Sequence, residues 1–142
     1  MFKLLSKLFL AGAVVSQPVI AVEDHFERTV GIHLLSNYGS EYSFLGDSIS
    51  KSDIEREINK LDWPNNFYQF VVISEPGVLM EVGGSLHPSD GLSARHLNRR
   101  TKTEGIIVSP PESVEEMSDI LIRFTTGDSW KAKYKFDFVT YE

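Results

Sequence analysis

The most informative part of the chain runs from Glu81 to Phe138 and reads EVGGSLHPSDGLSARHLNRRTKTEGIIVSPPESVEEMSDILIRFTTGDSWKAKYKFDF. Its clearest pattern is helical. Ser113 and Glu116 have the spacing of a capping box, in which the serine hydroxyl accepts a hydrogen bond from the first helical turn. We predict a helix that begins near Glu112 and ends at Gly127. Apolar residues recur on one face of this helix, at Val114, Met117, Ile120, Leu121 and Phe124.

Strand patterns flank this helix on both sides. Before it, Glu104–Val108 is short and apolar, and after it Trp130–Phe138 alternates aromatic residues with lysines. Further upstream, Phe67–Ser74 is almost continuously apolar, and a turn separates it from Val78–Val82. These two runs are the expected centre of the sheet. The segment Gly83–Arg100 contains three glycines and a proline, and we predict a long irregular loop there.

The first part of the domain adds a hairpin and a second helix. Thr29–Leu35 and Tyr42–Leu45 are expected to pair as strands. Ser52 and Glu55 have capping-box spacing, so a helix is predicted over Asp53–Leu61. The order of elements predicts an α+β fold, with a small, mostly antiparallel sheet and two helices packed on one face.

The first 21 residues have two interpretations. Lys3 and Lys7 precede a short apolar run, and Val19-Ile20-Ala21 has the small residues that a signal peptidase recognises. This pattern is typical of a cleavable secretory signal, and the alternative is an amphipathic helix docked on the domain. Residues 22–142 then form a single domain. The protein is expected in the periplasm if the segment is cleaved and in the cytoplasm if it is not.

Composition limits the classes of partner. The chain has 142 residues, of which 42% are hydrophobic and 24% charged, as in an ordinary globular domain. Its net charge of −6 argues against nucleic acid and favours a basic partner. The apolar run near the start is too short to span a bilayer, so no stable membrane insertion is expected. The absence of cysteine excludes disulfides, thiolate metal sites and a cysteine nucleophile.

Ser85, His87 and Asp90 place the residue types of a catalytic triad in one segment. A serine nucleophile elbow requires glycine two positions after the serine, where this chain has His87. The simpler interpretation is that Ser85, Ser89 and Asp90 satisfy backbone groups of a turn. We therefore expect no catalytic residues in this segment and no enzymatic activity.

No cofactor or metal ion is expected. The four histidines, at positions 25, 33, 87 and 96, lack the spacing of a zinc site, and His33 lies in an apolar strand pattern typical of a structural histidine. The two tryptophans are interpreted as core residues. The lysines at 131, 133 and 135 are interpreted as charges that keep an edge strand from pairing with other chains. Four basic residues lie close together in the sequence, at Arg95, Arg99, Arg100 and Lys102. Such a group either binds a phosphate or an acidic partner, or forms a solvated face of a loop.

The order of motifs from Lys51 to Phe138 resembles a family of bacterial immunity proteins that accompany polymorphic and contact-dependent toxins, including deaminase toxins. The matching features are a glycine and serine after a strand, the end of a helix and a following tryptophan, at Gly84, Ser85, Phe124 and Trp130. The resemblance implies a small α+β sandwich without enzymatic activity that binds and blocks its own toxin. This chain departs from the family in its amino-terminal extension and its longer Asp90–Ala94 segment.

These observations lead to one expected function and one alternative. The expected function is that of an immunity protein, which neutralises a cognate and basic toxin domain by occluding its active site. The expected partner-binding residues are Ser85, His87, Asp90 and Arg95. The alternative is a periplasmic binding or accessory protein that is not an enzyme and has no connection to a toxin.

Overall fold

The structure is a computed structural model that describes residues 26–142. The signal-like segment 1–21 and the start of the domain at residue 22 lie outside these described residues. Within residues 26–142, no helix has the length and apolar character needed to cross a membrane.

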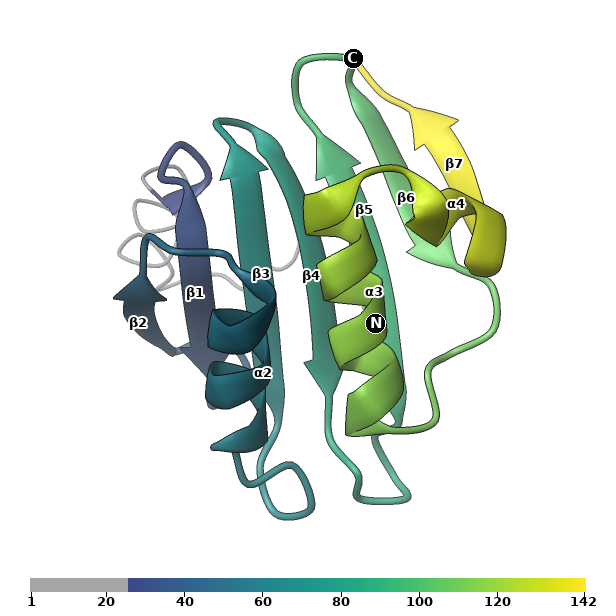
Figure 1. Cartoon of the computed structure of the whole chain (residues 1–142). Coiled ribbons are helices and arrows are strands. Elements are labelled where there is room, and N and C mark those ends of the chain that lie inside the picture. Colours follow the sequence, from purple (N-terminus) through teal and green to yellow (C-terminus); the bar gives the residue numbers. More distant parts are fainter. Residues whose placement is uncertain (1–25) are drawn as a thin grey trace.

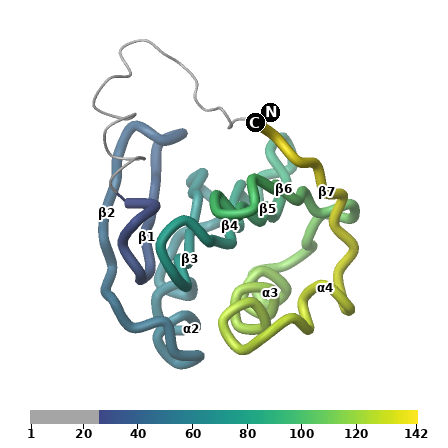
Figure 2. Tube along the Cα trace, turned by 90° about the horizontal axis from the view of Figure 1, so that it is seen from above, coloured from purple at the N-terminus to yellow at the C-terminus, as the bar shows by residue number. Residues whose placement is uncertain are grey.

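The described residues form one antiparallel sheet of seven strands with helices on one face (Figures 1 and 2). The strand order is β2-β1-β3-β4-β5-β6-β7, so most strands pair with their neighbours in the sequence. The α+β fold and the largely antiparallel sheet are thereby confirmed. The strands are β1 (Gly31–Ser36), β2 (Glu41–Gly46), β3 (Tyr68–Glu75), β4 (Val78–Gly84), β5 (Leu92–Asn98), β6 (Thr103–Ile107) and β7 (Phe136–Thr140).

Both faces of the central strands are buried. Phe70 and Val72 of β3 belong to the large core beneath the helices, whereas Val71 and Ile73 belong to a smaller cluster on the opposite side. We call this opposite side, which carries His33, Val71, Glu81 and Arg95, the second face. The continuous apolar run predicted for β3 follows from this arrangement, since successive side chains of a strand point to opposite faces.

The helices are α2 (Lys51–Asn59), α3 (Val114–Thr126) and α4 (Ser129–Lys133), and Figure 2 shows all three on the same side of the sheet. Ser113 caps α3 as predicted, because its hydroxyl accepts the Glu116 N–H at 3.1 Å. Gly127 ends α3 at φ 152° and ψ −146°, a region open essentially only to glycine. The predicted cap of α2 is wrong by two residues. Ser50, not Ser52, accepts the Asp53 N–H at 3.2 Å.

Two predicted elements differ from the structure. The predicted loop over Gly83–Arg100 contains β5, and only residues 85–91 connect it to β4. The predicted strand over Trp130–Phe138 is divided between α4 and β7. Trp130, the first residue of this segment, is only 2% exposed. Further along, the Tyr134 hydroxyl donates a hydrogen bond to the carboxylate of Asp119 in α3 at 2.6 Å. These two anchors hold the first part of the segment as a helical turn against α3.

Candidate functional site

The Ser85 side chain is part of the scaffold of the β4–β5 loop. Ser85 is 2% exposed, and its hydroxyl donates to the Asp90 carboxylate at 2.7 Å and accepts the His87 N–H at 3.1 Å. The Ser85 N–H donates to the Gly91 carbonyl at 3.1 Å, which closes the base of the loop. These contacts are those of a turn whose backbone is satisfied by short polar side chains.

His87 does not approach the Ser85 hydroxyl with its ring. Its Nδ1 lies 2.8 Å from the Ser89 hydroxyl, so the ring bonds within the outer part of the loop. A triad requires the histidine between the serine and the acid, whereas here the serine bonds the acid directly. The three residues therefore lie close together, but in a structural arrangement. His87 and Asp90 are exposed at the surface of the loop.

Gly84 explains why the loop begins where it does. It ends β4 at φ 114°, and a Cβ built on it would clash with the Gly91 carbonyl oxygen. The residue must therefore be glycine for the two ends of the loop to approach each other. The loop is also tied to the rest of the domain, since the Leu86 N–H donates to the Trp63 carbonyl at 2.9 Å.

Arg95, the fourth expected partner-binding residue, lies apart from the other three. It is in β5 on the second face, where its Nη1 lies 3.4 Å from Glu81 and its Nε lies 2.9 Å from Glu104. Its side chain is only 14% exposed. The prediction that Arg95 belongs to a loop was wrong because β5 was not recognised, and Arg95 forms an ion pair within the sheet. A partner at the β4–β5 loop would not contact it.

The other two residues from which the resemblance was predicted also lie in the core. Phe124 and Trp130 are both buried, with ring centroids 6.4 Å apart, and the ring of His96 packs 4.6 Å from Trp130. Together with Gly84 and Ser85, they secure two connections, the β4–β5 loop and the α3–α4 corner. The resemblance thus rests on residues that shape the fold.

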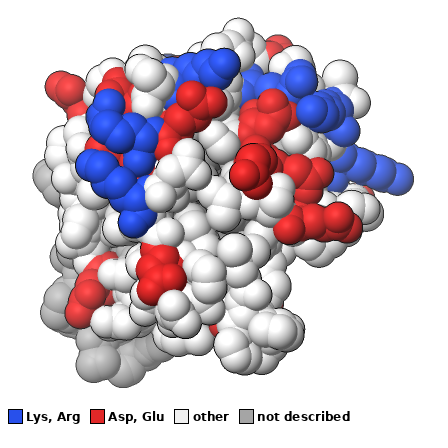
Figure 3. Space-filling model, turned by 60° about the horizontal axis from the view of Figure 1, so that its bottom comes forward, with Lys and Arg blue, Asp and Glu red and all other residues white. Residues whose placement is uncertain are grey.

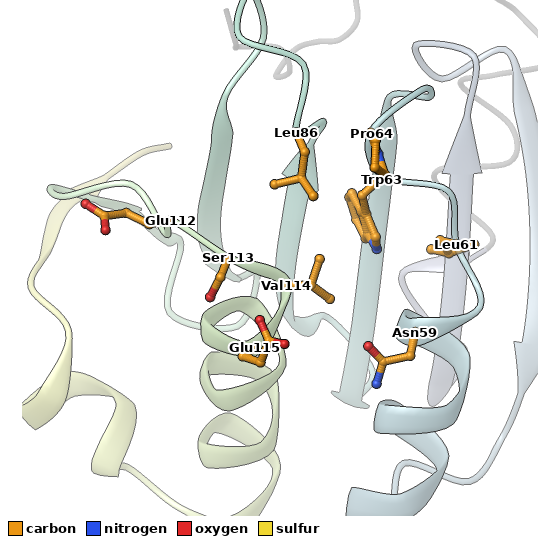
Figure 4. A pocket seen from close by; sticks show the side chains of 9 residues that line it. All are labelled: Asn59, Leu61, Trp63, Pro64, Leu86, Glu112, Ser113, Val114 and Glu115. Atoms are coloured by element: carbon orange, nitrogen blue, oxygen red, sulfur yellow. The ribbon is translucent and has the colours of Figure 1, made fainter.

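A groove lies beside the β4–β5 loop. It has a volume of about 410 Å³ and is bordered by the start of α3, the end of α2 and the segment after α2. Figure 4 shows Leu86, Trp63 and Val114 converging on it from three elements. The lining is completed by Asn59, Leu61, Pro64, Glu112, Ser113 and Glu115. Leu86 is 42% exposed, so an apolar side chain stands at the surface where the groove meets the loop.

The charges around the groove are mainly acidic. We define the loop end of the molecule as residues 60–67, 85–91 and 112–115. It exposes four carboxylates, those of Asp62, Asp90, Glu112 and Glu115. Its only lysine or arginine is Lys60, whose Nζ lies 3.4 Å from the carboxylate of Glu57. In Figure 3 Lys and Arg atoms lie beside Asp and Glu atoms over the upper part of the molecule, and the few charged atoms toward its lower edge are acidic. A groove with an apolar part and an acidic rim fits an apolar side chain flanked by basic ones.

Sequence analysis identified only part of this site. Asp90 and His87 were found because they lie in a glycine-rich segment, but the groove residues come from three separate segments. Trp63 is buried, as expected of a core residue, and Val114 is partly buried against the same core, and both side chains also line the groove. A sequence does not show which ends of its elements meet, so nothing in it distinguished these positions.

His33 is a structural histidine, as predicted. It is fully buried, with Nδ1 2.8 Å from the Tyr42 hydroxyl and Nε2 2.8 Å from the Thr29 carbonyl. Over residues 26–142, no three His, Asp or Glu side chains are placed to hold a metal ion.

Comparison with protein-family models, curated proteins and solved structures found no significant match to this chain.

Proposed function

We propose that this protein is an immunity protein that binds a cognate bacterial toxin and neutralises it by occluding its active site, without catalysing a reaction. The observation that supports the proposal best is the loop end, where exposed carboxylates lie around a groove with both apolar and polar side chains in its lining. A toxin that acts on nucleic acid has a basic active site, and an acidic surface competes for the same groups.

Charge and apolar contact have different parts in this proposal. Exposed carboxylates accelerate encounter with a basic partner but contribute little affinity, because water and salt screen them. Affinity requires an anchor that loses contact with water on binding. Leu86 and the groove beside it supply the apolar surface for such an anchor. Asp90 and Glu115 then orient the toxin over it.

This assignment replaces two of the four residues expected from the sequence. Asp90 and His87 stay in the proposed interface because they are exposed on the loop. Ser85 supports the loop from below, and Arg95 lies on the second face. The compartment in which the protein meets the toxin depends on residues 1–21. It is the periplasm if they are cleaved as a signal peptide and the cytoplasm if they are not.

The test begins with the full-length tagged chain, purified from its native cells together with any bound protein. A captured protein supports the proposal only if it is toxic when expressed alone and harmless when this chain is co-expressed. The purified pair should then bind with one-to-one stoichiometry. Capture of envelope proteins that show no toxicity would overturn the proposal and favour the periplasmic accessory protein.

A pair of charge variants tests the site. Glu112→Lys with Glu115→Lys should lower the association rate constant for the toxin roughly tenfold at low salt, with a smaller effect at high salt. The matched control is Asp128→Lys with Glu142→Lys, which changes the net charge equally at the other end of α3 and at the C-terminus. Equal effects of the two variants would show that binding depends on net charge and not on the loop end.

A further inference from the structure

Exposed apolar side chains concentrate at one edge of the sheet, which we call the β7 edge. In the part of the chain that the structure describes, seven large apolar residues are exposed, and four of them lie on β7, on the neighbouring β6 or directly after β6. They are Ile106, Val108, Phe138 and Val139, with exposed fractions of 44 to 59%. This grouping differs from the scattered single apolar residues that are normal on protein surfaces.

The backbone of β7 is available for pairing on its outer side. Val139, Asp137 and Lys135 direct their backbone groups toward β6, as the hydrogen bond from the Val108 N–H to the Lys135 carbonyl at 2.9 Å shows. Since these directions alternate along an antiparallel strand, the N–H and C=O of Phe136, Phe138 and Thr140 point away from β6. Among the described residues, no strand pairs with this side of β7.

Of the three lysines that were expected to protect this edge, only Lys135, which directly precedes β7, lies beside it. Lys131 and Lys133 are in α4, where Lys131 lies over the Trp130 ring and Lys133 pairs with Asp119 at 3.1 Å. The only charged residue within β7 itself is Asp137. Natural edge strands are usually protected by lysine, proline or a bulge. The five residues FDFVT have little of this protection, and four of them favour strands.

We propose that two copies of this chain pair through β7, in antiparallel orientation and centred on Phe138, to extend the sheet across a twofold axis. A closed pair related by a twofold axis uses the same surface in both copies and leaves no β7 edge open. Phe138 and Val139, which lie on opposite faces of the sheet, then pack beside β7 of the second copy.

The pattern of backbone groups selects this register. Pairing centred on Phe138 places Phe138 opposite Phe138 and Phe136 opposite Thr140, and all of these residues direct their hydrogen-bonding groups outward. It also places Asp137 opposite Val139 of the other copy. Pairing centred on Asp137 would place two carboxylates opposite each other, which is unfavourable. Pairing centred on Val139 avoids that contact, but it leaves the outward-pointing groups of Phe136 without a partner in β7 of the other copy.

Two substitutions at the same exposed position test both the dimer and its register. Val139→Glu places a carboxylate opposite Asp137 of the second copy and should raise the dimer dissociation constant roughly tenfold, as two symmetric pairs become repulsive. Val139→Lys places a cation there and should leave the dimer as stable as the wild type or make it more stable. The measurement is sedimentation equilibrium of the full-length chain over a wide range of concentrations.

A second pair of variants tests the strand pairing without changing any charge. Thr140→Pro deletes an N–H that points outward and leaves the pairing with β6 intact, so it should weaken the dimer, whereas Thr140→Ala should not. The melting temperature of each variant shows whether the substitution destabilises the monomer. This control is needed at residue 139 because Glu104 lies opposite it on β6, so that a new charge there also acts within the monomer. A wild-type chain that stays monomeric at its highest soluble concentration overturns the proposal. Equal weakening by Val139→Glu and Val139→Lys overturns the register.

Discussion

The two faces of the central sheet are built from the same strands but held by different interactions. Toward the helices, Phe70, Met80 and Val82 pack in an apolar core. On the second face, the smaller apolar cluster adjoins a polar group in which Glu81 accepts a hydrogen bond from Gln69 at 3.0 Å and pairs with Arg95. The strand register sets this pair, because Glu81 and Arg95 lie directly opposite each other.

The difference shows two ways of stabilising a buried strand. Apolar packing depends on volume and tolerates changes of partner, provided that the space is filled. A buried ion pair depends on the presence of both members, because removal of one leaves the other without a partner in a poorly solvated position. The helix side should therefore respond to lost volume, and the second face to a lost partner.

The largest effect is expected from a cavity on the helix side. Phe70→Ala removes a fully buried ring and should lower the free energy of unfolding by about 4 kcal/mol. Val71→Ala, its neighbour on the second face, removes less volume and should lower it by about 2 kcal/mol. Both values are measured by urea denaturation. The comparison requires that the dependence of the unfolding free energy on urea concentration is the same as in the wild type. If the two losses are equal, the helix side is not the better packed of the two.

An intermediate effect is expected from His96, which is buried at the helix side beside Trp130. Burial and the positive charge of Lys131 lower the pKa of His96 to about 4, although Asp128 opposes the shift. Between about pH 6.5 and pH 4 the unfolded chain binds a proton that the folded chain does not. Stability should therefore fall as the pH falls through this window, by at most about 3 kcal/mol.

The pH dependence is measured by urea denaturation from neutral pH downward. His96→Phe should remove this part of the dependence, because phenylalanine does not titrate. His87→Ala is the control, because it removes an exposed imidazole from the β4–β5 loop and leaves His96 in place. A wild-type profile that is flat between pH 6.5 and pH 4 would contradict the burial of a neutral His96.

The smallest effect is expected on the second face. Glu81→Ala should lower the free energy of unfolding by about 2 kcal/mol, less than for an isolated buried pair, because Arg95 keeps Glu104 as a partner. A double-mutant cycle with Arg95→Met isolates the interaction and should give a coupling of about 1 kcal/mol. If the losses of unfolding free energy in the two single variants add up to the loss in the double variant, the Glu81–Arg95 pair does not stabilise this face.

The fold class could be predicted because local patterns and topology agree. The capping box at Ser113 and the apolar stripe of α3 are properties of a few neighbouring residues, and the structure has both. The failure at β5 has a physical cause: Arg95 and His96 are polar, but the sheet buries both, one in an ion pair and one among aromatic rings. A strand that buries polar groups in this way does not look like a strand in its sequence.

The loop end was harder to predict than the fold. The β4–β5 loop was visible in the sequence because of its glycines, whereas the groove requires Trp63, Leu86 and Val114 to meet from distant segments. Alternation of apolar residues from Trp130 onward also predicted a single strand. Contacts with Asp119 of α3, which no local pattern encodes, make the first part a helix.

The hydrogen bonds within the β4–β5 loop have a consequence for recognition. The loop is closed by Ser85 and Asp90 and fastened to the α2–β3 segment through the Leu86 N–H. A surface that is ordered before its partner arrives loses little conformational entropy on association. Ser85 thus contributes to the affinity of any complex at this end without contacting the partner. It does so by ordering the loop before association.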